Sequence, residues 1–275
     1  MYSTLFGGLA VLAYLTATFV MFRSLRPDRG PSPAPSVSGR WGALSVGWLA
    51  AGLHALAIVG LLATSGGPNF SFLSALSTVS WIIVAIVLLA ALFKPVEKLG
   101  LVVFPLAALI LLLKLLIPEE ARTVSNHSWP MAAHIVSSVL AYAFLNIAAI
   151  QALLLALQDW CLRHRSAGGP LVRSLPALQT MESLLFQLIG AGFVLLTVSL
   201  VTGFLFLENM FAQHLAHKTV LSLLAWIVFA TLLIGRFRHG WRGQTAIRWT
   251  LGGFVSLMLA YFGSKMVLEW ILDRA

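Results

Sequence analysis

The chain reads Ser80-Trp-Ile-Ile-Val-Ala-Ile-Val-Leu-Leu-Ala-Ala-Leu-Phe93 in one continuous run, and no charged side chain interrupts the 24 residues from Phe70 to Phe93. An α-helix needs about 20 apolar residues to cross a bilayer. The rest of the sequence has the same character, because 59% of its 275 residues are hydrophobic, 10% are charged, and the mean hydropathy is +0.92. A soluble core cannot absorb so much apolar sequence, so the chain is predicted to be an integral membrane protein.

Eight stretches are long and apolar enough to span a bilayer. They lie near Tyr2–Phe22, Trp41–Thr64, Phe70–Phe93, Leu99–Leu116, Trp129–Gln158, Met181–Leu207, Leu215–Ile234 and Thr245–Leu268. The predicted fold is an all-α bundle of about eight transmembrane helices that form a single polytopic membrane domain over residues 1–275. Two stretches rich in proline and small residues, 26–36 and 165–176, are predicted to be mobile cytoplasmic linkers.

Lysines and arginines divide unevenly between alternate connections. Thirteen of the 18 follow the first, third, fifth and seventh spans: Arg23, Arg26, Arg29, Arg40, Lys94, Lys98, Arg163, Arg165, Arg173, Arg236, Arg238, Arg242 and Arg248. The other five are Lys114, Arg122, Lys218, Lys265 and Arg274. The richer side is cytoplasmic by the positive-inside rule, so both termini are predicted to be external and the first helix to be uncleaved. The net charge of +9 then belongs to one membrane face, and no nucleic acid partner is expected.

Sequence motifs for hydrolysis or phosphate chemistry do not occur. The chain has no His-Glu-x-x-His, no P-loop, no Gly-x-Ser-x-Gly and no pair of intramembrane aspartates. The protein is therefore predicted to bind or handle a ligand and not to be an enzyme. The single Cys161 excludes an internal disulfide, and without Cys-x-x-Cys-His any heme is expected to be held non-covalently.

His134 is the first candidate ligand. It follows the interfacial residue Trp129 by five positions, which corresponds to a depth of about 7 Å below the external surface. Ser137 and Ser138 follow one turn further in and leave a shallow surface against which a flat porphyrin could lie. The alternative is a hydrogen bond between helices, which polar residues in membrane spans often make.

Two more histidines lie in the stretch Phe211-Ala-Gln-His214-Leu-Ala-His217-Lys218, where an external connection becomes the seventh span. Neutral imidazoles from two helices can hold heme iron without covalent attachment. His134 and His217 are therefore the preferred ligands of heme iron, with His214 as a less certain one and Lys218 beside a heme propionate. Zinc bound by the His-x-x-His pair and an ordinary interfacial pair are the alternatives.

His54 is predicted to lie near mid-membrane, among Gly47, Ala50, Ala51 and Ala57 at helical spacing. An ionisable group at this depth needs a partner. A carbonyl, Asn146, a tyrosine or iron could supply it, so His54 is either a packing residue or the inner ligand of a second heme site.

Three stretches carry a resemblance to a known family: Trp129-Pro-Met-Ala-Ala-His134-Ile-Val-Ser-Ser-Val-Leu-Ala-Tyr142, then Gly190-Ala-Gly-Phe-Val-Leu-Leu-Thr197 with Gly203, and Trp226 followed by Gly240-Trp-Arg-Gly243. Over about 42–270 the chain resembles the cytochrome c assembly family of CcsA/CcmC-type membrane heme handlers, and most of all its YpjD/HemX-like inner-membrane branch. The resemblance implies a multi-pass protein of the bacterial inner membrane with His134 in the position of one heme ligand.

The chain departs from the family pattern between the sixth and seventh spans. Glu208-Asn-Met-Phe-Ala-Gln-His214-Leu-Ala-His217 replaces the expected Trp-rich, Asp-containing heme loop, and no histidine follows His239. The expected function is heme handling or cytochrome c assembly with non-covalent heme b, in contact with heme, the lipid bilayer and other assembly or membrane proteins. A heme-free membrane scaffold or regulatory protein is the first alternative, and a metal or small-solute transporter is the second.

Overall fold

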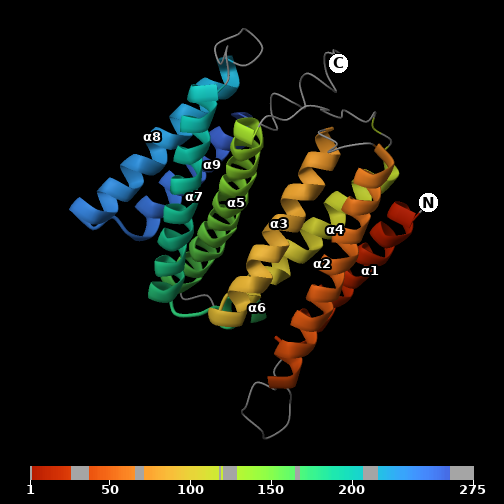
Figure 1. The fold of residues 1–275 in the computed structure, drawn as a ribbon. Helices are drawn as coiled ribbons and strands as arrows, with labels where there is room; N and C mark the ends of the chain where they lie inside the picture. The colour runs from red at the N-terminus through yellow and green to blue at the C-terminus, as the bar shows by residue number, and fades with distance from the viewer. Residues whose placement is uncertain are drawn as a thin grey trace, which may run out of the picture. The chain divides into compact units, whose positions relative to one another are not determined.

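The computed structural model describes residues 2–25, 37–65, 71–117, 119, 129–164, 168–206 and 216–260, and no strand occurs among them. The elements are α1 (Tyr2–Arg23), α2 (Val37–Ser65), α3 (Phe72–Phe93), the 3-10 turn η1 (Glu97–Leu99), α4 (Gly100–Leu116), α5 (Trp129–Arg163), α6 (Pro170–Arg173), α7 (Leu178–Phe206), α8 (Ala216–His239) and α9 (Gly243–Met258) (Figure 1). Seven of these helices are long and apolar enough to cross a membrane. The prediction of an all-α multi-pass membrane protein is confirmed.

The eighth predicted span, Thr245–Leu268, begins within α9 and runs past Ala260 out of the described residues. The stretch 165–176 is a partial correction, because α6 forms one helical turn where a linker was predicted. Pro170 occupies its first helical position, where a missing backbone N–H has no cost. Helix α5 continues to Arg163 and α8 to His239, past their predicted ends at Gln158 and Ile234. Basic residues in the last turns of both helices interact favourably with the negative end of the helix dipole and so stabilise these ends.

The helices group into two compact units. Unit 1 comprises residues 1–125 and 167–175, and unit 2 comprises 126–166 and 176–275. A single polytopic domain over the whole chain stays a prediction. In unit 1, α1 packs against α2 and α4, and α3 packs against α2 and α4; Figure 1 shows α1 and α2 side by side. The Tyr14 and Phe104 rings stack in its buried centre with centroids 6.0 Å apart.

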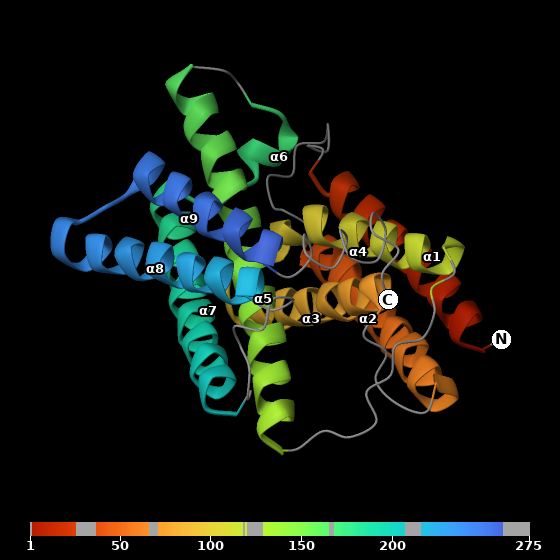
Figure 2. The same cartoon turned by 90° about the horizontal axis from the view of Figure 1, so that it is seen from above.

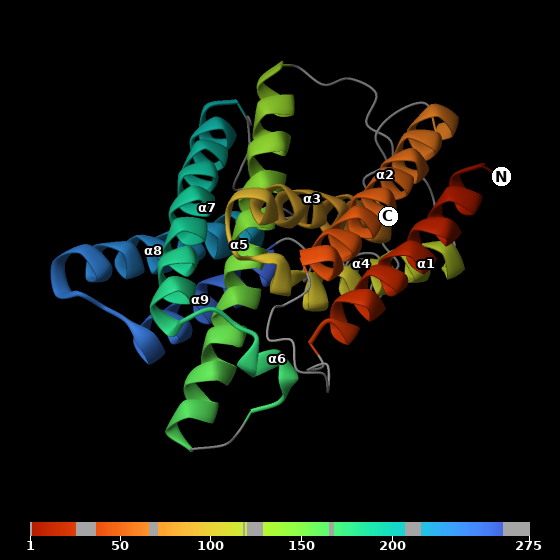
Figure 3. The ribbon, with the colours of Figure 1, turned by 90° about the horizontal axis from the view of Figure 1, so that it is seen from below.

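Unit 2 is built from α5, α7, α8 and α9. Helix α5 packs against α7 and α9, and α8 packs against the same two helices. Figure 2 shows the corner that joins α8 to α9, and Figure 3 shows α5 beside α7. Gly192 of α7 lies so close to α5 that an added Cβ would come within 2.7 Å of Leu145. The α5–α7 contact therefore depends on the missing side chain at Gly192.

Three hydrogen bonds fix the register of unit 2. The Tyr142 hydroxyl on α5 donates to the Leu257 carbonyl on α9 at 2.6 Å. The neighbouring Ser256 hydroxyl donates to the Leu221 carbonyl on α8 at 2.9 Å. The Trp226 indole on α8 donates to the Thr197 hydroxyl on α7 at 2.9 Å. Successive helices in contact run antiparallel, so the start of α5, the end of α7 and the start of α8 lie at the same end of unit 2.

Candidate functional site

His134 lies in the second turn of α5 and is half-buried. Its Nδ1 is 2.9 Å from the backbone carbonyl oxygen of Ser199 on α7. A carbonyl oxygen only accepts, so Nδ1 is the donor and carries the hydrogen. A neutral imidazole has one N–H, which leaves the lone pair on Nε2. Histidines that ligate metals commonly donate their second nitrogen to a carbonyl in this way.

Hydroxyl groups surround this contact. The Ser138 hydroxyl lies 2.6 Å from both the His134 carbonyl and the Ser199 hydroxyl. The Thr202 hydroxyl donates to the same Ser199 carbonyl at 3.0 Å. Ser137 donates within its own helix, to the carbonyls of Ala133 and His134. The helix–helix hydrogen bond that the sequence left as an alternative is therefore present at Nδ1, and Nε2 bonds none of the residues that the structure describes.

His217 belongs to the first turn of α8, but its side chain lies outside the described residues, and His214 lies outside them entirely. The backbone still indicates the depth of His217. His217 precedes Leu221 by four residues, or about 6 Å, and His134 precedes Tyr142 by eight residues, or about 12 Å. Leu221 and Tyr142 both bond to the end of α9, at Ser256 and Leu257. Both histidines thus lie on the same side of that level, at depths that differ by about 6 Å.

His54 is fully buried in unit 1, where three helices meet. Its Nε2 is 2.9 Å from the Ser77 hydroxyl of α3, and its Nδ1 is 3.3 Å from the Tyr14 hydroxyl of α1. The Tyr14 ring meets the imidazole edge-on at 5.9 Å. Both ring nitrogens have protein partners, so iron ligation by His54 requires one of these hydrogen bonds to break.

The remaining histidines lie elsewhere. His164 stacks on Trp160 at the end of α5, and His239 is exposed at the end of α8. His127 is outside the described residues. Within the described ranges, no three side chains of the types His, Cys, Asp and Glu come together as a metal site.

Ser199 and Thr202 complete the surroundings of His134 and were not among the residues predicted from the sequence. Their spacing of three within an apolar stretch, from Val198 to Thr202, was a signal that they share one helix face. It could not reveal which helix they face, because the pairing of helices in a bundle leaves no local pattern.

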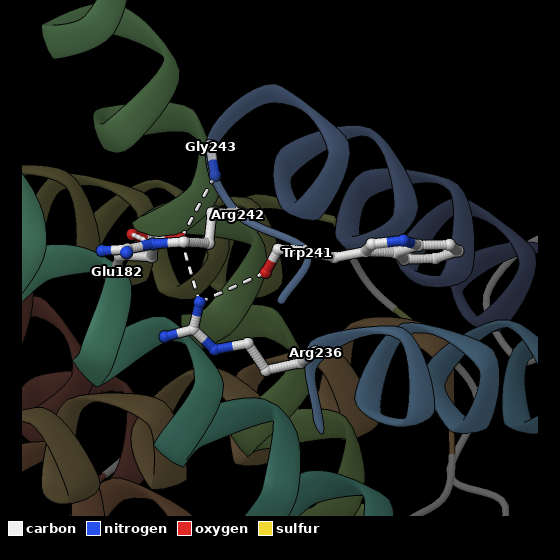
Figure 4. Close-up of polar contacts among 5 residues, drawn as sticks. All are labelled: Glu182, Arg236, Trp241, Arg242 and Gly243. Carbon is white, nitrogen blue, oxygen red and sulfur yellow. Dashed lines mark hydrogen bonds and ion pairs between the residues drawn. The ribbon is translucent and has the colours of Figure 1, made fainter. Parts of the chain in front are cut away.

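A second polar cluster, the Glu182 clasp, joins three helices at the opposite end of unit 2 (Figure 4). Glu182 of α7 is buried, and its Oε1 accepts from the Gly243 backbone N–H at 3.2 Å. Arg236 of α8 lies 3.6 Å from Oε1, and Arg242 donates its Nε to Oε2 at 3.3 Å. Arg236 also donates to the Trp241 carbonyl at 3.3 Å. The clasp fixes the turn between α8 and α9 against α7.

The sequence matches the family described as Cytochrome C assembly protein over residues 43–272. Inner membrane protein YpjD of Escherichia coli (strain K12) is 34% identical over 220 residues, covering 79% of this chain and 83% of that protein. An uncharacterized 28.8 kDa protein in the nifR3-like 5' region of Azospirillum brasilense is 31% identical over 244 residues, covering 84% and 86%. Cytochrome c biogenesis protein CcsA of Gloeobacter violaceus is 32% identical over 106 residues, covering 38% and 31%. No solved structure matches the chain.

Proposed function

Because the chain belongs to the cytochrome c assembly protein family, we propose that it binds heme and acts in heme handling or cytochrome c assembly. The observation that carries this proposal is the hydrogen bond from His134 Nδ1 to the Ser199 carbonyl. That bond fixes the ring and leaves Nε2 with the lone pair that iron requires. The proposed role is binding and transfer, without catalysis.

In this proposal His134 of α5 and His217 of α8 would hold the iron of a non-covalent heme b. Two imidazoles would leave iron six-coordinate and low-spin, which suits carriage or electron transfer. Lys218, next to His217 and half-buried, would lie beside a propionate. His214 is the alternative ligand on α8. A second heme at His54 is the least supported part, because Tyr14 and Ser77 already bond its nitrogens.

The finer topology is also proposed. The protein is a multi-pass protein of the bacterial inner membrane, with eight spans and both termini outside, and lipid covers its apolar helix faces. The end of unit 2 that carries His134 and the start of α8 then faces the exterior. A heme held there is positioned for delivery to proteins on that side or for exchange with other assembly components.

The test uses His134→Asn in the full-length protein. The asparagine side-chain amide takes the place of Nδ1–H, so the bond to Ser199 is retained while Nε2 is lost. We expect wild-type protein in mild detergent to show a Soret band and sharp low-spin bands after reduction. We expect His134→Asn to keep the wild-type thermal midpoint and lose the low-spin spectrum, and His217→Ala to lose the same spectrum.

The matched control is His164→Ala, because His164 is exposed just past the end of α5 and its imidazole contacts the Trp160 carbonyl and ring. Its heme content should equal that of the wild type. Unchanged heme content in His134→Asn would contradict the ligand assignment.

A heme-free scaffold or regulatory role is the second candidate function. The observation that favours it is the sequence from Glu208 to His217, which replaces the Trp-rich loop expected in the family. Wild-type protein that stays colourless even after heme is supplied would support this role and overturn the first.

A further inference from the structure

The turn between α8 and α9 is strongly basic. We define the α8–α9 corner as residues Arg236–Trp249, which contain Arg236, Arg238, Arg242 and Arg248 and no acidic residue. Two carboxylates bond this segment. Glu182 contacts Arg236 and Arg242, and Asp159 of α5 accepts from the Gln244 side-chain amide at 2.6 Å and also pairs with Arg163. Arg238 and Arg248 are exposed, and no carboxylate within the described ranges pairs with either. The four arginines and Glu182 therefore carry a net charge of +3, and Arg163 balances Asp159.

The Glu182 clasp leaves the end of one guanidinium group free to bind. Arg242 uses its Nε for the bond to Glu182, and its side chain remains 56% exposed. Its two terminal nitrogens make no hydrogen bond to a described residue. A guanidinium held at Nε keeps a planar pair of donors that matches the oxygens of a phosphate. The buried carboxylate thus orients Arg242 and does not neutralise the whole corner.

Aromatic residues lie beside the arginines. Trp241 packs on Trp249 of α9 with ring centroids 5.4 Å apart, and His239 lies 6.4 Å from Trp241. Figure 4 shows the Trp241 indole pointing away from Glu182. Phe237 is 85% exposed. Tryptophan prefers the depth of lipid headgroups, and an exposed phenylalanine at a helix end suits contact with acyl chains.

The backbone of the corner is held in one conformation. The Trp241 N–H donates to the Gly235 carbonyl at 3.2 Å, and the indole lies where a Cβ on Gly235 would clash. Gly240 and Gly243 adopt φ values of +66° and +53°, which only glycine adopts without strain. A turn ordered before binding loses little entropy when a ligand arrives.

We propose that the α8–α9 corner binds the headgroup of an anionic phospholipid. Its arginines would contact the phosphate oxygens, and Trp241 and Phe237 would contact the glycerol and acyl region. A lipid is favoured over a soluble phosphate because the corner joins membrane-crossing α8 to α9 and presents aromatic residues beside its charges. Arginine clusters at the cytoplasmic ends of membrane helices recognise anionic headgroups by this chemistry.

The test measures lipid binding to the full-length protein in detergent by native mass spectrometry. The probes are phosphatidylglycerol and phosphatidylcholine at equal concentration. The corner variant is Arg238→Gln/Arg242→Gln/Arg248→Gln, and the matched control is Arg23→Gln/Lys94→Gln/Arg173→Gln. The control removes the same charge from exposed basic residues that are predicted to lie on the same membrane face and do not contact the corner.

We expect wild-type protein to prefer phosphatidylglycerol, the corner variant to bind it at least tenfold less, and the control to change less than twofold. Equal losses in both variants, or none in either, would overturn the proposal. Displacement of the lipid by millimolar inorganic phosphate would also overturn it, since the site would then take a free anion. If the triple variant does not fold, Arg238→Gln/Arg248→Gln leaves the Glu182 clasp intact and should lose binding about threefold or more.

Discussion

The hydroxyl of Ser138 touches both partners of the His134 contact, whereas the adjacent Ser137 hydroxyl bonds only within α5. Substitutions at these two positions can therefore distinguish the loss of a serine hydroxyl on α5 from the loss of the hydrogen bond to α7. Residues that orient a metal-binding histidine commonly change metal affinity by tenfold to a hundredfold without touching the metal.

We expect Ser138→Ala to weaken heme binding about tenfold, because Ser199 loses the hydroxyl that fixes it beside His134. The measurement is a heme titration followed by absorbance. Ser137→Ala is the control and should bind heme as the wild type does. Equal affinities for the two variants would show that the Ser138 link does not position His134.

At the level of helices, the hydropathy pattern predicts where seven spans run, because burial in lipid requires long apolar stretches whatever their neighbours. It does not predict which helices touch. The contact between α5 and α7 depends on Gly192 lying against Leu145, and the three-helix contact at His54 depends on Tyr14, 40 positions away in sequence. A tyrosine was among the possible partners of His54 in the sequence, but nothing local selected Tyr14.

Gly192→Ala should destabilise unit 2 by about 1–3 kcal/mol, because the new methyl group would push Leu145 out of the α5–α7 contact. Gly190→Ala is the matched control, since an added Cβ there meets nothing within 4 Å. The thermal midpoint of the purified protein in one detergent reports the difference. A midpoint for Gly192→Ala at or above that of Gly190→Ala would contradict the close-approach explanation.

For the whole chain, the sequence predicts an orientation that the arrangement of helices does not test. Single cysteines at Trp129 and His239, both exposed, are predicted to lie on opposite sides of the membrane. In a Cys161→Ser background, an impermeant maleimide added outside intact cells should label Trp129→Cys and not His239→Cys. Labelling of His239→Cys from outside would contradict the predicted orientation.

The eighth span is tested separately. A periplasmic phosphatase fused after Ala275 should be active if this span exists.

The same predicted orientation assigns the His134 end of unit 2 to the exterior and the Glu182 clasp to the cytoplasm. The sequence could supply His134 as a candidate, because a histidine five residues past Trp129 is unusual in an apolar span. It could not supply the availability of Nε2, which depends on a backbone carbonyl 65 positions further along the chain. The type of residue in the sequence therefore indicates which side chains could bind a ligand. Which atoms of those side chains remain unbonded depends on how the helices pack.

The Glu182 clasp has a consequence for biosynthesis. Glu182 leaves the ribosome more than 50 residues before Arg236, so its carboxylate has neither arginine partner while α7 is being made. We infer that Glu182→Gln should lengthen the lifetime of a nascent chain ended at Ile234 and shorten that of the full chain. A pulse-chase experiment in which Glu182→Gln changed both lifetimes in the same direction would refute this. The clasp can close only when α7, α8 and the start of α9 are all in place, since each contributes a group to it.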